Sequence, residues 1–218
     1  MSSRSHWLTK RLILGFMILG ILLGLPAPIL TTYGVAWTQQ RTIAWDKVIA
    51  ETTDSEDVES QLLRGIAFAN LGRLPEAFKE FEIAGQETHT DEVADFVLDK
   101  VRDLRRTPDD LLLLNCAAFG SYAFGDFTQS TGYFEDVIRL DPNNVWARNF
   151  CAIVYGQAGQ LDKAQNHLKG ALSLDPKNQY THLLMSAVYK EKNQYLMAVY
   201  HYLQAPEAIK ELQKYGIL

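Results

Sequence analysis

A short motif occurs twice in this chain, and the distance between its copies indicates a repeat architecture. RLDPNN occupies residues 139–144 and SLDPKN occupies 173–178, so the motif recurs with a period of 173 − 139 = 34. A fixed period of this size is typical of helical repeat arrays. Pro142 and Pro176 cannot continue a helix, and each disfavours helical backbone at the preceding Asp. Each copy is therefore expected to end one helix and to precede the next.

The same period relates residues that suit tight turns between helices. Gly125, Gly159 and Asn193 follow one another at this interval, and all three tolerate the positive φ that such turns need. Small residues such as Ala164 and Ala198 recur at this spacing too, and they allow two antiparallel helices to approach closely. The pattern predicts three two-helix units, at 111–144, 145–178 and 179–212.

This alternation of small and large residues resembles the tetratricopeptide repeat family. The resemblance covers about residues 58–212, with an upstream copy that contains Gly65, Phe68, Gly72, Ala77, Phe81 and Ala84. It implies an all-α fold, a solenoid of helix–turn–helix repeats. The step from Gly72 to Gly125 exceeds one period by the length of a helix, which indicates an insertion. The expected organisation is an N-terminal membrane anchor or signal peptide at 1–30, a helical linker at 31–57, a repeat-like unit at 58–91, an extra helix at 92–110, repeats at 111–144, 145–178 and 179–206, and a capping helix at 207–218.

The N-terminal residues have the character of a membrane anchor. Residues 12–30 form an uninterrupted run of apolar, glycine and proline residues, close to the ~20 residues that a spanning helix needs. A cleaved signal peptide is the alternative. Arg4, Lys10 and Arg11 precede the run, which places the N-terminus in the cytoplasm and the repeats across the membrane. We therefore expect a single-pass membrane protein with extracytoplasmic repeats.

The remaining chain is acidic. Of the 21 basic residues three lie before the apolar run, so 18 basic and 26 acidic residues follow, a formal net charge of −8. Nucleic-acid binding needs clustered Lys and Arg facing phosphates. The charge therefore argues against a nucleic-acid partner.

No motif of an enzyme or a metal site occurs in the sequence. The histidines lack metal-ligand spacing, and His167 and His201, which are one period apart, are expected at the solvated surface of stacked second helices. Cys116 and Cys151 are expected to be small core residues rather than a disulfide, because neighbouring repeat helices lie ~8–10 Å apart. We expect no enzyme activity, no cofactor and no metal.

The resemblance implies a concave groove lined by the first helix of each repeat. Asn side chains both donate and accept hydrogen bonds, so a ladder of them is suited to holding a peptide backbone, and aromatic residues supply rigid contact area. The basic residues with which some members of the family clamp a terminal carboxylate are missing. The alternative is that some of these aromatics pack against the next repeat or the capping helix. The groove residues are expected to be Leu112, Asn115, Phe119, Tyr122, Trp146, Asn149, Ile153, Gln157, Tyr180, Leu183 and Lys190.

These expectations favour a membrane-anchored scaffold or assembly factor that binds a protein or peptide segment in the groove. One alternative is an anchored assembly factor whose repeats face the cytoplasm or stroma and serve an electron-transfer or photosynthetic complex. A second is an envelope enzyme with a site in the 86–110 insertion, for which no nucleophile–base pair is present.

Overall fold

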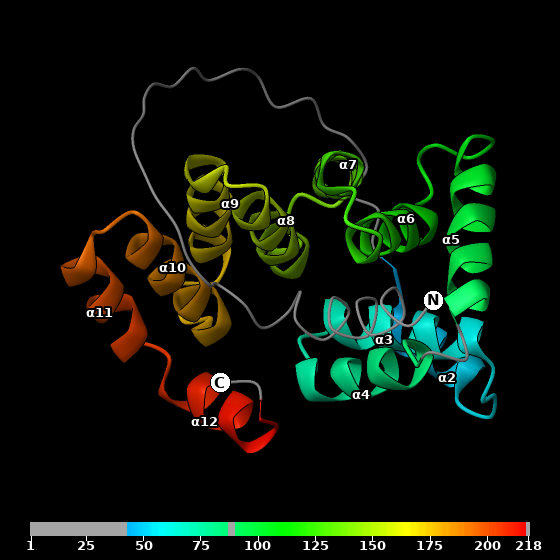
Figure 1. Cartoon of the computed structure of the whole chain (residues 1–218), viewed down its shortest axis with the longest axis horizontal. Coiled ribbons are helices and arrows are strands. Elements are labelled where there is room, and N and C mark those ends of the chain that lie inside the picture. Colours follow the sequence, from blue (N-terminus) through cyan, green and yellow to red (C-terminus); the bar gives the residue numbers. More distant parts are fainter. Residues whose placement is uncertain (1–42, 87–89, 217–218) are drawn as a thin grey trace.

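The computed structural model describes residues 43–86 and 90–216, which form α-helices and no strand (Figure 1). The predicted anchor at residues 12–30 lies outside these ranges. Within them, no helix has both the length and the apolar character needed to cross a bilayer. The helices are α2 (Trp45–Thr52), α3 (Val58–Asn70), α4 (Leu74–Ala84), α5 (Thr90–Leu104), α6 (Leu111–Ala123), α7 (Phe127–Leu140), α8 (Val145–Gln157), α9 (Leu161–Leu174), α10 (Gln179–Glu191), α11 (Tyr195–Leu203) and α12 (Pro206–Lys214).

The repeated DP motif ends one helix and starts the next. Asn144 caps α8 by accepting a hydrogen bond from the Ala147 amide at 2.8 Å, and Asn178 caps α10 through the Thr181 amide at 3.0 Å. Such caps satisfy amides that have no partner within the first turn of a helix. The final Asn of each copy is therefore the residue from which the next unit begins.

The turns within the units have the predicted backbone. Gly125, Gly159 and Asn193 have φ of 79°, 72° and 57°, and Gly72 in the upstream copy has φ of 74°. This left-handed conformation is accessible to Gly and Asn at low steric cost. The turn prediction is thus confirmed, and each turn joins the two antiparallel helices of one unit.

From α5 onward, successive helices pack side by side in a row: α5 on α6, α6 on α7, α7 on α8, α8 on α9, α9 on α10 and α10 on α11. In this row α5 packs against α6, the first helix of the next unit, just as α7 packs against α8, the first helix of the unit after it (Figure 1). The insertion therefore supplies the helix that precedes the first unit of the row. Because α5 holds this place, the α3–α4 hairpin is not the next member of the row.

The α3–α4 hairpin lies across the first helices of the row instead. Helix α3 contacts both α6 and α8, and Figure 1 shows α3 and α4 below them. A shared aromatic cluster joins the two parts: the Phe119 ring of α6 lies 5.8 Å from Phe81 of α4, 5.3 Å from Phe134 of α7 and 5.0 Å from Phe150 of α8, measured between centroids. One continuous core therefore includes the hairpin and the row.

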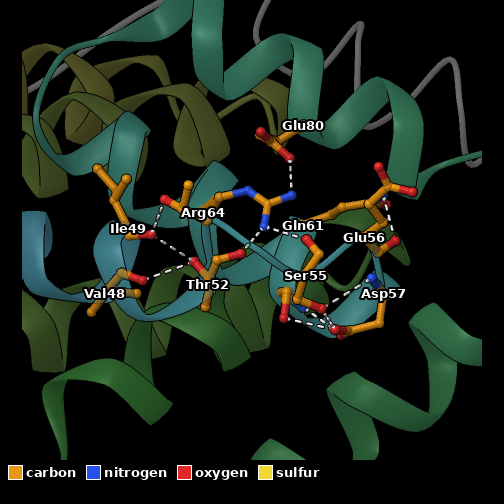
Figure 2. A network of polar contacts seen from close by, with 11 residues as sticks. Val48, Ile49, Thr52, Ser55, Glu56, Asp57, Gln61, Arg64 and Glu80 are labelled. Carbon is orange, nitrogen blue, oxygen red and sulfur yellow. Dashed lines mark hydrogen bonds and ion pairs between the residues drawn. The ribbon is translucent and has the colours of Figure 1, made fainter.

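Helix α2, which begins within the expected linker, is part of the folded domain. Figure 2 shows Arg64 of α3 reaching back to it. The guanidinium donates to the carbonyl oxygens of Thr52 and, at 2.7 Å, Ser55, and pairs with Glu80 of α4 at 3.0 Å. Trp45 of α2 is buried in the core. One half-buried side chain thus ties α2, the following loop and α4 together.

Candidate protein-interaction surface

The predicted groove residues lie on α6, α8 and α10, but the structure buries several of them. Asn115 and Asn149 are each 1% exposed, and Phe119 and Tyr122 are buried as well. The expectation that these four side chains meet a partner is therefore corrected. Asn115 and Phe119 contact the α3–α4 hairpin, at Asn70 and Phe81, whereas Asn149 and Tyr122 contact other helices of the row.

The side-chain oxygens of the expected ladder accept hydrogen bonds within the chain, whereas Asn149 Nδ2 is buried without a partner among the described residues. Asn115 donates to the Leu111 carbonyl at 2.7 Å, and its Oδ1 accepts from Asn70 of α3 at 3.1 Å. Asn149 Oδ1 accepts from the Thr181 hydroxyl at 2.9 Å. A buried amide without a partner costs about 1–3 kcal/mol, so each of these bonds stabilises the folded chain. The ladder stabilises the solenoid rather than a bound peptide.

The α3–α4 hairpin covers the N-terminal half of the groove. The Trp146 ring packs against the backbone of Gly72, so closely that a Cβ atom added to Gly72 would overlap it. On its other sides the ring lies 6.2 Å from Phe150 and 5.6 Å from Tyr180, between centroids. Trp146 is therefore a packing residue between the hairpin and the row.

Helix α12 covers the C-terminal half. Tyr180 and Leu183 pack against the small apolar cluster of Ala205, Ala208 and Ile209. The Tyr180 hydroxyl donates to Glu211. Gln179 Oε1 accepts from the first amides of α12, those of Glu207 at 2.8 Å and Ala208 at 3.2 Å. Tyr180 therefore packs against the capping helix, which was the alternative to a binding role for the groove aromatics.

The remaining groove positions do not form a continuous surface. Leu112 and Ile153 are partly buried against the core. Gln157 and Lys190 are exposed at the ends of α8 and α10. A binding role for these four residues stays a prediction.

The exposed apolar side chains gather on α11 instead. We call the following set the α11 surface: Tyr195, Leu196, Met197, Val199, Tyr200, Tyr202 and Leu203, with exposed fractions from 42% for Met197 to 89% for Leu196. Only Ala198 and His201 of this helix are buried. Figure 1 shows α11 at the outer end of the row. The sequence contains a signal for this surface, because YLMAVYHYL has no Asp, Glu, Lys or Arg.

Within residues 43–86 and 90–216, α11 is left open because the chain turns away after it. The second helices α7 and α9 are each covered by the first helix of the next unit, α8 and α10. Helix α12 follows α11 but packs mainly on α10. The place beside α11 that a further first helix would occupy is not filled by α12.

Both histidines expected at the surface are instead packed. His201 is 7% exposed and His167 is intermediate, and each stacks on the tyrosine of its own unit, His201 on Tyr189 at 5.3 Å and His167 on Tyr155 at 5.4 Å. The solvated-surface prediction is wrong for both. Cys116 and Cys151 are buried and unbridged, as expected.

A buried histidine pair fastens α11 to α10. His182 Nε2 lies 3.1 Å from the Pro176 carbonyl, which can only accept, so Nε2 carries a proton. His182 Nδ1 lies 2.8 Å from His201 Nδ1, and in neutral His182 this nitrogen accepts the His201 proton. Burial first, and then the proximity of His182, lower the pKa of His201. The fold therefore favours the neutral form of His201.

We expect acidification to weaken this domain through His201. Its folded-state pKa lies below the ordinary value of about 6.5, so the unfolded chain binds more protons in that window. The contribution of neutral His201 to the free energy of unfolding is complete above about pH 6.5. It is lost as the pH falls towards the folded-state pKa of His201. His201→Phe, which keeps a ring on Tyr189, should lose less unfolding free energy between pH 7.5 and 5 than the unaltered chain. Parallel pH profiles of urea unfolding for the two proteins would contradict this.

Comparisons with known proteins agree with the helical repeats. A tetratricopeptide repeat family model matches residues 121–188. A structure of MamA, residue 41 to the end, from Desulfovibrio magneticus RS-1 is 17% identical and covers 77% of this chain and 87% of its own, with a TM-score of 0.50. MamA AMB-1 is 18% identical, with 78% and 99% covered and a TM-score of 0.49. No curated protein matches by sequence. The similarity to the structure from Desulfovibrio magneticus RS-1 shows a shared fold.

Proposed function

We propose that this chain, of which residues 121–188 match a tetratricopeptide repeat family model, is a membrane-anchored scaffold or assembly factor that binds another protein through the α11 surface. The observation that carries the proposal is the set of seven large apolar side chains exposed on one helix without a charged residue. Contiguous apolar patches are uncommon on monomeric proteins and mark sites of interaction. A scaffold of this kind needs no catalytic group.

The partner that fits the α11 surface best is an amphipathic helix of another protein. In the row, an exposed second helix is covered by a helix whose apolar stripe packs against it, as α8 covers α7 and α10 covers α9. A partner helix that takes the same place next to α11 continues this packing. Tyr195, Tyr200 and Tyr202 offer large, rigid contacts of the type found at interaction hot spots. The surface has no charge, so recognition depends on an apolar stripe.

Membrane attachment through residues 12–30 is the second part of the proposal. The basic residues Arg4, Lys10 and Arg11 support a cytoplasmic N-terminus and repeats on the opposite side. The partner then resides in, or next to, the same membrane. A C-terminal reporter enzyme that is active only outside the cytoplasm tests the side, and an inactive reporter would contradict it.

Site-specific photo-crosslinking from native membranes tests the α11 surface. A photoreactive residue replaces Leu196, which is 89% exposed, and in a matched control it replaces Leu98 of α5, which is 65% exposed. We expect position 196, and not 98, to crosslink to one protein at a segment with an amphipathic helical pattern. In the same background Leu203→Asp should reduce the crosslink at least about tenfold, equivalent to about 1.4 kcal/mol of binding.

Several outcomes would contradict the proposed mode of binding. They are crosslinks from position 196 to a second copy of this chain or to lipid alone, a partner segment without an apolar stripe, and a crosslink that Leu203→Asp leaves unchanged. Leu203 is 68% exposed, so its substitution should leave the melting temperature unchanged. Loss of the crosslink in an unfolded variant would therefore be recognised by thermal denaturation.

A further inference from the structure

Three side chains that can bind a metal ion meet where two repeat units join. They come from three successive helices: Glu135 from α7, Cys151 from α8 and His167 from α9. His167 Nε2 lies 3.0 Å from Glu135 Oε1 and 3.7 Å from Cys151 Sγ. All three potential ligand atoms lie within 4.8 Å of one another.

The arrangement does not fit a cysteine nucleophile. In a Cys–His–carboxylate relay, the thiol and the carboxylate contact opposite nitrogens of the imidazole. Here both contact the same nitrogen, Nε2. Cys151 is also fully buried, and this burial raises the pKa of its thiol, the opposite of what activates a nucleophile. The three groups instead converge on one point, as metal ligands do.

We propose that Glu135, Cys151 and His167 form a zinc-binding site. Tetrahedral zinc has bond lengths of about 2.3 Å to sulfur and about 2.0–2.2 Å to nitrogen and oxygen, which places nitrogen and sulfur ligands about 3.6 Å apart and nitrogen and oxygen ligands about 3.4 Å apart. The observed separations of 3.7 Å and 3.0 Å differ from these by a few tenths of an ångström. One thiolate, one imidazole and one carboxylate form a ligand set typical of zinc.

The surroundings of the three ligands suit a bound cation. The Tyr155 hydroxyl donates to Glu135 Oε1 at 3.0 Å, and the Tyr155 ring stacks on His167, so this residue orients two of the ligands. Glu135 is exposed and gives the ion a route from solvent, and a water can fill the fourth position. The thiolate and the carboxylate would neutralise the two charges of the ion. The nearby cations Arg148 and Lys163 favour the deprotonated forms of these two ligands but repel the ion itself.

A metal at this place would connect the unit at 111–144 to the unit at 145–178. Glu135 belongs to the first unit, and Cys151 and His167 belong to the second. Each unit contacts mainly its neighbours in a solenoid, so stability depends on such interfaces. An ion that binds only the folded chain increases its stability. The site would thus act as a clamp between repeats.

Zinc binding by the metal-free full-length chain tests the site. We expect one zinc ion per chain in competition with a chromophoric chelator, and a higher melting temperature with zinc. Cobalt in place of zinc should give a thiolate-to-metal charge-transfer band. Cys151→Ser, His167→Gln and Glu135→Gln should each weaken binding at least about tenfold, since even loss of a hydrogen-bond partner of a ligand costs this much.

Cys116→Ser and His201→Gln are the matched controls, because each removes a buried side chain of the same type outside the cluster. Both should retain one zinc ion and the cobalt–thiolate band. Glu135 is exposed, so Glu135→Gln keeps the test valid if the Cys151 variant fails to fold. The proposal is overturned by the absence of saturable binding, by a cobalt spectrum without the thiolate band, or by equal affinity in the ligand variants.

Discussion

Phe119→Ala should lower the unfolding free energy by about 3–5 kcal/mol, the range for truncating a buried phenylalanine. Phe119 is 8% exposed, and its ring contacts Phe81, Phe134 and Phe150, which belong to three different helices. The truncation leaves a cavity where the α3–α4 hairpin meets the row. Urea unfolding followed by far-ultraviolet circular dichroism measures the loss.

Phe124→Ala is the control for this change. Phe124 follows α6 in the sequence and is 37% exposed, so the same truncation should cost no more than about 1 kcal/mol. The pair also distinguishes the two roles considered for Phe119. If Phe119 contacted only a partner, its truncation would weaken binding and leave the stability of the free chain unchanged. Equal unfolding curves for Phe119→Ala and Phe124→Ala would therefore rule out a core role for Phe119.

Gly72→Ala should detach or displace the α3–α4 hairpin. Alanine at a φ of 74° costs about 1–2 kcal/mol in backbone energy. Its Cβ would also overlap the Trp146 ring, and overpacking of this kind costs about a further 1–3 kcal/mol. We expect faster hydrogen exchange in α3 and α4 and a lower midpoint of urea unfolding.

Gly159→Ala separates the two causes. Gly159 has nearly the same φ, 72°, but nothing lies within 4 Å of the position where its Cβ would be. This variant should therefore show the backbone cost alone. If both alanine variants lose equal stability and the exchange of α3 and α4 is unchanged, Trp146 does not hold the hairpin in place.

The features that the sequence predicted are those that repeat along the chain. The period of the repeats, the turns at Gly125, Gly159 and Asn193 and the helical character all depend on local residues. Backbone conformation at a turn is set by the residue that occupies it, so a pattern of glycine and asparagine is sufficient. The prediction of a helical repeat fold succeeded for this reason.

The features that were missed depend on how distant segments meet. The hairpin of α3 and α4 could equally have continued the row, and only long-range contacts, such as that of Gly72 with Trp146 and that of α3 with α8, show that it does not. Family analogy therefore assigned Asn115, Phe119 and Asn149 to an open groove. Nothing local to these residues indicates that another part of the chain covers them.

A regular spacing relates Glu135, Cys151 and His167, the three residues of the proposed zinc site. Glu135, Cys151 and His167 are evenly spaced along the chain, and each step is close to half of the repeat period. The connections α7–α8 and α8–α9 lie about midway between the residues of each pair, so this spacing places them at similar heights on antiparallel helices. The three residue types differ, so no single residue type repeats with this spacing and marks the cluster.

The position of the α3–α4 hairpin means that the concave face already has an occupant on the same chain. A tethered segment competes at an effective concentration on the order of mM for a short connection, whatever its concentration in solution. A peptide that enters there must displace the hairpin, break the bond between Asn70 and Asn115 and expose the Trp146 ring. A free peptide must therefore compete with the hairpin, whereas no described residue has to be displaced for a partner to reach α11.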